Sequence, residues 1–183
     1  MKKIFFVFFF LSSITCLSNA QSSLKWVIGG RFGMSIASGG GGTSAGLQLG
    51  PMAELLFNKN MGVGTELNIN TQAGTPIEWA DYFKYYFDIP GNSNIKPYAD
   101  AGFNLWFFTG GPYFGIRFGG GVNFKIAPNL YIPADLQMGP VFISSSGGGG
   151  YYDYYYGTYV GGASTSSTVF YLAITSGIRY ELP

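Results

Sequence analysis

The sequence predicts an all-β protein, an eight-stranded antiparallel up-and-down transmembrane β-barrel. Segments along the chain alternate between apolar residues and polar or glycine residues with the two-residue period of a strand. Charged residues make up only 10% of the chain and aromatic residues 19%, whereas a soluble domain has about 25% charged residues. Short turns also alternate with mostly longer loops. Together these observations favour a barrel whose outer face does not meet water.

The first twenty residues, "MKKIFFVFFFLSSITCLSNA", have the pattern of a secretory signal peptide: a positive start, an apolar run over residues 4–11 and small residues up to Ala20. We expect cleavage after Ala20, so that residues 1–20 are removed and residues 21–183 form one membrane-embedded β-barrel domain. Cys16 lacks the leucine three places upstream that lipid-anchored proteins carry. We therefore favour cleavage over a lipid anchor.

Cleavage at this point would remove the only cysteine and two lysines. The formal charge of +1 would become −1, since +1 − 2 = −1. The remaining chain offers no disulfide framework and no basic patch of the kind that binds nucleic acid. No later apolar run approaches the roughly 20 residues that a membrane helix requires.

The clearest strand is "YFGIRFGGGVNFKI" at residues 113–126. Phe114, Ile116 and Phe118 share one face, whereas Arg117 and the neighbouring glycines share the other. The same alternation or a weaker form of it recurs in seven other segments, at residues 24–37, 45–57, 61–71, 79–89, 95–108, 130–143 and 168–182.

The connections place the two ends of the predicted barrel. Short turns and longer loops alternate in an up-and-down membrane barrel, with both termini on the short-turn side. The expected short turns are 58–60, 90–94 and 127–129, and the expected longer connections are 39–42, 72–78, 109–112 and 144–167, the last being the longest.

Charged residues follow the polar parity of the strands, so we expect them inside the barrel, where they can form ion pairs rather than face lipid. The interior network is expected to contain Arg31, Glu54, Glu66, Lys84, Asp100, Arg117, Asp135 and Arg179. The same parity adds Lys25, Asp88, Lys96, Lys125 and Glu181. A soluble barrel would reverse the faces and leave the large aromatic residues in water.

Outward aromatic residues concentrate near the expected strand ends and would form two interfacial girdles. The turn side would carry Trp26, Phe57, Phe87, Phe124 and Tyr180, and the loop side Phe107, Phe114, Phe142 and Phe170. Prolines conflict with this assignment, because a closed barrel has no edge to accommodate a missing donor. We expect bulges, strand ends or shifted boundaries at Pro51, Pro97, Pro133 and Pro140.

The run "FKYYFDIPGNSNIKPYADAGFNLWF" at residues 83–107, together with the signal peptide and the alternating segments, resembles the small outer-membrane β-barrel domain family, the OmpA/OmpX-like proteins sometimes described as porin-family. The resemblance covers essentially the whole mature chain. It implies a place in the cell outer membrane, with outer-membrane lipid as a permanent partner.

The carboxyl end is similar to the sorting signal that this family presents to the barrel-assembly machinery. Thr175, Gly177, Tyr180 and Leu182 fit its order of a polar residue, a glycine and two hydrophobic residues on alternate positions. The family usually ends on an aromatic residue, whereas this chain ends on Pro183.

The chain contains no histidine, which excludes Ser-His-Asp hydrolysis and imidazole-based metal catalysis. The carboxylate pairs Asp100 with Asp135 and Glu54 with Glu66 are conceivable acid-base groups, although ion pairing explains them better. We expect no enzymatic activity, no catalytic or metal site and no cofactor.

Two functions fit these features. The first is a structural or surface-interaction protein that presents loops from a narrow barrel, and the second is a small-solute channel. An eight-stranded barrel is filled by side chains, which favours the first. A soluble secreted β-domain is a third and weaker alternative.

The segment "GGGGYYDYYYGTYVGGAS" at residues 147–164 lies in the longest expected loop. Tyrosine supplies large contact area with little side-chain entropy to lose, and glycine and serine supply adaptability. The candidate contact residues for an unidentified extracellular ligand are Tyr151, Tyr152, Tyr154, Tyr155, Tyr156 and Tyr159. The alternatives are that this loop extends the barrel wall or covers its mouth.

Overall fold

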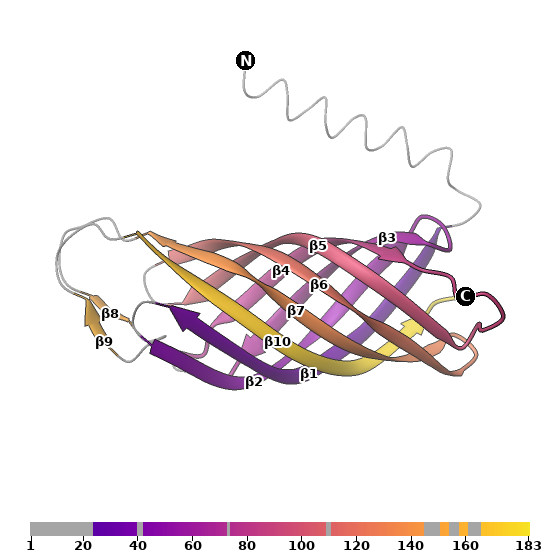
Figure 1. The fold of residues 1–183 in the computed structure, drawn as a ribbon, viewed down its shortest axis with the longest axis horizontal. Helices are drawn as coiled ribbons and strands as arrows, with labels where there is room; N and C mark the ends of the chain where they lie inside the picture. Colours follow the sequence, from indigo (N-terminus) through magenta and orange to yellow (C-terminus); the bar gives the residue numbers. More distant parts are fainter. Residues whose placement is uncertain are drawn as a thin grey trace, which may run out of the picture.

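A computed structural model describes residues 24–39, 42–72, 74–108, 111–144, 151–153, 158–160 and 166–183. In these residues, eight long strands close into one antiparallel barrel and two short strands form a separate hairpin (Figure 1). The predicted fold class is therefore confirmed. The barrel strands are β1 (Lys25–Gly39), β2 (Gly42–Leu56), β3 (Met61–Asn70), β4 (Ile77–Tyr86), β5 (Ile95–Phe108), β6 (Gly111–Ala127), β7 (Leu130–Ser144) and β10 (Ser166–Glu181).

The first and last barrel strands close the sheet. β1 pairs with β10 from Val27–Glu181 to Ser38–Phe170, and with β2 on its other side. Each remaining strand pairs with its neighbours in sequence order. Because every barrel strand has two partners, the sheet has no open edge, as a bilayer requires. The described ranges contain no helix long and apolar enough to cross a membrane.

The two faces of the strands separate as the alternation predicts. On β10, Phe170, Ile174 and Ile178 are about 60% exposed on the outside, at 61%, 63% and 60%, while Tyr171 and Arg179 are buried inside. The exposed girdle residues are Trp26, Phe87, Phe124, Tyr180, Phe107, Phe114, Phe142 and Phe170. The ninth expected girdle residue, Phe57, is half-buried in the turn that follows β2.

β4 begins and ends earlier than the sequence predicts. It spans Ile77–Tyr86 rather than residues 79–89. The chain leaves the sheet because Ile89 and Asn92 bracket a turn in which the Asn92 amide donates to the Ile89 carbonyl at 3.1 Å. Gly91 takes a φ of 78°, which suits glycine at the third position of such a turn.

The four prolines lie inside continuous strands, so the expected strand ends and bulges at these positions are wrong. The register of β2 against β3 is unchanged between the Leu49–Ile69 and Met52–Glu66 pairs, and the ladder is interrupted only at Gly50 and Pro51. Similar interruptions without a register shift occur at Pro133 towards β10 and at Pro140 towards β6. Pro97 lies near the start of β5 and stays paired with Val122.

Three of the charged residues expected inside are exposed, namely Lys25, Asp88 and Lys125. Lys25 is the first residue of β1, and Asp88 lies in the turn after β4. The pairing of β6 with β7 shifts between Lys125 and Ala127, which changes the orientation of the strand end. Lys96 and Glu181 are half-buried near strand ends. Parity fails at these positions because the barrel wall, which separates inside from outside, ends there.

Candidate functional site

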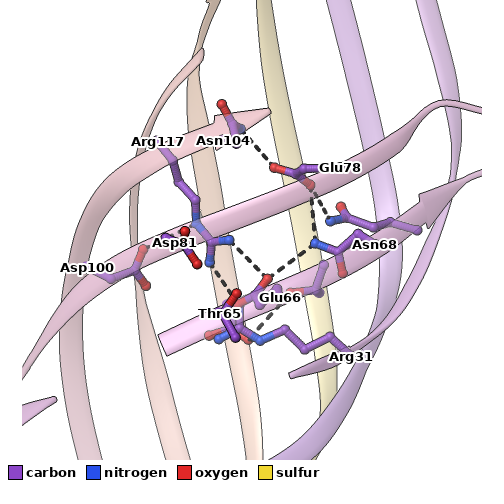
Figure 2. Close-up of polar contacts among 12 residues, drawn as sticks. Arg31, Thr65, Glu66, Asn68, Glu78, Asp81, Asp100, Asn104 and Arg117 are labelled. Atoms are coloured by element: carbon purple, nitrogen blue, oxygen red, sulfur yellow. Dashed lines mark hydrogen bonds and ion pairs between the residues drawn. The ribbon is translucent and has the colours of Figure 1, made fainter. Parts of the chain in front are cut away.

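The barrel interior holds the eight charged residues expected from the sequence. Each is buried, and each comes from a different barrel strand, so the whole wall contributes charges to the interior. Arg31, Glu66, Asp100 and Arg117 are shown in Figure 2. In chain order they are Arg31, Glu54, Glu66, Lys84, Asp100, Arg117, Asp135 and Arg179. Alternation places one of these side chains inside from every strand.

Glu66 is the centre of the first cluster. Arg117 Nη1 and Nη2 donate to Glu66 Oε2 and Oε1 at 2.9 and 3.0 Å, a bidentate arrangement, and Arg31 Nη1 pairs with Glu66 Oε1. Arg31 Nε also lies 3.4 Å from Asp135 Oδ2, and Arg117 Nε lies 3.6 Å from Asp100 Oδ1. Two guanidiniums are thus balanced by three carboxylates in the middle of the barrel.

Glu54 is the centre of the second cluster, nearer the turn side. Its carboxylate lies 3.4 Å from Lys84 Nζ and 3.3 Å from Arg179 Nη2, and it accepts a hydrogen bond from the Tyr86 hydroxyl. The Lys84 ammonium also lies 4.2 Å from the ring centre of Tyr98. Aromatic rings thus supply part of the surroundings of the buried cations.

Glu78 extends the network towards the loop side. Its carboxylate accepts hydrogen bonds from Asn104 Nδ2 at 2.8 Å, Gln48 Nε2 at 3.1 Å and Asn68 Nδ2 at 3.2 Å. Among the ion pairs formed by the described residues, none includes Glu78. Its direct polar partners are therefore amide groups.

The sequence interpretation missed Glu78 because it assigned residues 72–78 to a loop. The signal was present, since Glu78 shares the parity of Ala80, Tyr82 and Lys84 on β4. Gln137 was also missed. When its amide oxygen faces the guanidiniums, it accepts from Arg31 Nη1 and from Arg117 Nη2, the latter at 2.8 Å. A neutral glutamine gives no charge signal in the sequence.

Apolar and aromatic side chains close both ends of the charged interior. On the turn side, Tyr86 and Tyr98 lie 5.6 Å apart between ring centres, and on the loop side Trp106 and Tyr171 lie 5.5 Å apart. The turn-side cluster comprises Val27, Leu56, Tyr86 and Tyr98. The loop-side cluster comprises Ala37, Trp106, Tyr113, Val141, Ile143, Val169 and Tyr171.

The four carboxylates that the sequence offered as acid-base pairs are engaged in ion pairs rather than with one another. Asp100 faces Arg117 and Asp135 faces Arg31, while Glu54 and Glu66 belong to separate clusters. Within the described ranges, no three His, Cys, Asp or Glu side chains form a group suited to a metal ion.

The predicted contact loop is described only in part. Tyr151 and Tyr152 lie in β8 (Tyr151–Asp153) and Tyr159 lies in β9 (Thr158–Val160), two strands that pair as a hairpin with Tyr152 opposite Tyr159. This hairpin lies between β7 and β10 in the chain, beyond the loop end of the barrel (Figure 1). Tyr154, Tyr155 and Tyr156, like the expected signal peptide at 1–20, lie outside the described residues.

The residues that resemble the assembly signal lie on β10 or directly after it. Thr175 and Gly177 face the interior, whereas Tyr180 and Leu182 face outwards at 39% and 37% exposure. The Leu182 amide still donates to the Trp26 carbonyl at 2.8 Å. The outward pair is thus accessible along the strand that closes the barrel, and recognition by the assembly machinery stays a prediction.

The closed barrel, its apolar exterior and its ion-paired interior define the class: the chain has the fold of small outer-membrane β-barrel proteins. Neisserial surface protein A is 17% identical, with a TM-score of 0.62 over 86% of this chain and 97% of that protein. The outer-membrane protein AlkL in lipid bilayers is 11% identical, with a TM-score of 0.56 over 87% of this chain and 90% of that one.

The N-terminal β-barrel domain of Pseudomonas aeruginosa OprF gives a third match, at 13% identity and a TM-score of 0.53 over 86% of this chain and 97% of that domain. No protein-family model and no curated protein sequence matches the chain. The resemblance to the OmpA/OmpX-like barrels is thus confirmed in the fold.

Proposed function

We propose that the protein is an integral, non-enzymatic component of the outer membrane that uses a closed barrel to hold surface loops for contact with an extracellular ligand. The observation that carries this proposal is the filled interior. Charged clusters cross the middle of the barrel, and apolar clusters lie above and below them. A solute would have to displace paired buried charges to pass, and each buried ion left without its partner costs several kcal/mol.

The exterior supports the membrane location. Large apolar side chains cover the outer face of every barrel strand, including Phe32, Leu49, Leu67, Trp79, Phe103, Phe118, Leu136 and Ile174. An apolar surface that surrounds a whole barrel is unfavourable in water and favourable in lipid. The solved structures that share the fold are also outer-membrane proteins.

The loop side supports the contact role. The connection between β7 and β10 runs from Ser144 to Ser166 and contains the β8–β9 hairpin, whereas the turn between β6 and β7 contains only Pro128 and Asn129. A rigid barrel lowers the entropy that a loop loses on binding, because both loop ends are already fixed. One similar structure is named as a surface protein, which agrees with this role.

Membrane fractionation combined with protease digestion of intact cells tests the proposal. We expect the chain in the outer-membrane fraction and cleavage within residues 145–165, with the barrel protected. Recovery in the soluble fraction would contradict the membrane location, and cleavage in the β6–β7 turn instead would contradict the orientation.

Replacement of the six tyrosines between residues 151 and 159 by serine tests the loop itself. We expect heat-modifiable migration on a gel to be unchanged and attachment of cells to glycan or protein arrays to fall. A loss of heat-modifiable migration would show that the loop belongs to the barrel structure. Unchanged attachment would contradict its role in contact.

A further inference from the structure

Asp81 is a carboxylate on the outer face of the barrel. It lies midway along β4, between the outward side chains of Trp79 and Phe83, while the intervening Ala80 and Tyr82 are buried inside. Outward carboxylates are unfavourable in the apolar belt of a membrane barrel. The sequence interpretation did not place this residue. Its position therefore needs an interaction that compensates for facing lipid.

Part of that interaction comes from neighbouring side chains. The Trp79 indole donates to Thr65 Oγ1 at 2.9 Å and to Asp81 Oδ1 at 3.2 Å. Thr65 and Asp81 are register partners on β3 and β4 (Figure 2). Within the described residues, the Thr65 hydroxyl accepts this bond but donates none from its side chain, and Asp81 Oδ2 accepts none. The triad thus has one donor and one acceptor unused.

The surface around the triad is hollowed. A groove of about 530 Å³ is lined by Trp26, Ala53, Val63, Thr65, Phe83 and Phe103. A second hollow of about 440 Å³ shares Ala53 and Thr65 and continues towards Pro51, Leu67 and Trp79. The lining of the larger groove combines the small residues Ala53, Gly64 and Gly102 with the aromatic residues Trp26, Phe83 and Phe103.

We propose that the outer face of β2–β5 binds a second copy of this chain within the membrane. Two copies inserted in one direction can be related by a two-fold axis along the membrane normal, and such an interface must be self-complementary. With the axis beside β3 and β4, the Thr65 hydroxyl of each copy donates to Asp81 Oδ2 of the other. The aromatic side chains of Trp26, Phe83 and Phe103 in each copy pack into the groove of its partner. This proposal rests on the proposed membrane location.

Self-complementarity favours a second copy over a lipid acyl chain. An acyl chain fills an apolar groove but leaves the Thr65 hydroxyl and the Asp81 carboxylate unpaired. The triad of a second copy, related by the two-fold axis, pairs both groups. Close association of membrane elements commonly combines small residues with polar side chains that hydrogen-bond across the interface.

Disulfide trapping in lipid vesicles tests the proposal. The only cysteine is Cys16, so a Cys16→Ser background carries no other thiol. In that background we expect Val63→Cys, in the groove, to form covalent dimers. The matched control is Ile174→Cys, midway along β10 on another part of the wall and 63% exposed. We expect about tenfold less dimer from the control at the same lipid ratio, which corresponds to a modest association energy.

Variants of Thr65 and Asp81 then distinguish the contribution of the hydrogen bonds to dimer formation from that of the groove's shape. Asp81→Leu and Thr65→Val should each lower the Val63→Cys dimer yield about tenfold, while Asp81→Asn, which keeps an acceptor, should retain most of it. Heat-modifiable migration identifies folded protein for each variant. Since Asp81→Leu replaces a charge by an apolar side chain on the lipid side, its barrel should fold.

Equal dimer yields from Val63→Cys and Ile174→Cys would overturn the proposal, as would unchanged yields in both Asp81→Leu and Thr65→Val. Trapping of Val63→Cys mainly to a different protein in whole membranes would overturn it in favour of a heterologous partner. Protein that can be extracted from vesicles by alkaline carbonate would instead contradict the membrane location itself.

Discussion

Replacement of Glu66 by glutamine should strongly destabilise the barrel without altering its shape. Glu66 is buried between Arg31 and Arg117, and it receives a bidentate pair from Arg117 at 2.9 and 3.0 Å. Removal of one partner of a buried ion pair costs about 3–5 kcal/mol because the other charge is left without compensation. Asp100 and Asp135 still face the two guanidiniums. We therefore expect the lower end, about 3 kcal/mol.

The assay is reversible urea unfolding of the refolded protein in lipid vesicles, followed by tryptophan fluorescence. Equal unfolding slopes would show that the change lies in stability rather than in compactness. The matched control is Asp88→Asn, which breaks the exposed pair between Lys59 and Asp88 at 2.8 Å. Exposed pairs contribute little, so the control should unfold like the unchanged protein. A Glu66→Gln change below about 1 kcal/mol would refute the ionic account of the interior.

Three further predictions concern the interior, the close approach of strands and the turn side. Glu78→Gln should destabilise the barrel less than Glu66→Gln in the same urea assay, because the direct partners of Glu78 are amides, whereas Glu66 pairs directly with two guanidiniums. An equal or larger loss would contradict that distinction. Gly139→Ala should lower the free energy of unfolding by about 1–3 kcal/mol, because a Cβ there would lie 1.8 Å from the Ile116 carbonyl oxygen. Gly30→Ala should be tolerated, because the nearest atom to its Cβ would lie at 3.5 Å. Similar losses from both would argue against close strand contact at Gly139. Lys59→Gln should raise the pKa of Asp88, which hydrogen bonds from Lys59 and Asn60 lower from its ordinary value of 3.8; an unchanged carboxyl titration by NMR would show that the pair does not form in solution. Since the pKa of Asp88 is lowered in the folded protein, the pair contributes fully to stability above the ordinary Asp pKa. This contribution is lost as the pH falls through the lowered pKa.

The period of two was sufficient to predict the barrel and eight of its inner charges, although Glu78 was missed because its strand was predicted to begin at residue 79. A side chain on a closed wall has only two directions, so parity alone places Arg31 or Arg117 inside once a strand is recognised. Parity fails where the wall ends, as at Lys25, Asp88 and Lys125. It also gives no account of Pro51, Pro133 and Pro140, whose missing donors are accommodated by local interruptions of one ladder.

The ion pairs inside the barrel could not be predicted from the sequence. Which carboxylate meets which guanidinium depends on the stagger between strands, and stagger is a property of the closed sheet rather than of any one segment. Glu66 and Arg117 are 51 residues apart and meet across the interior. For Asp81, the parity of β4 predicts an outward side chain. Only the structure shows that the Trp79 indole and the Thr65 hydroxyl lie beside it.

Electrical conductance in planar bilayers tests the closed-barrel account most directly. Refolded protein, inserted at known amount and verified by heat-modifiable migration, should give no stable single-channel steps. The reason is that buried ion pairs and apolar clusters lie across the interior, and an eight-stranded barrel has room only for side chains. Large, stable and reproducible steps would contradict the account and would favour a solute channel.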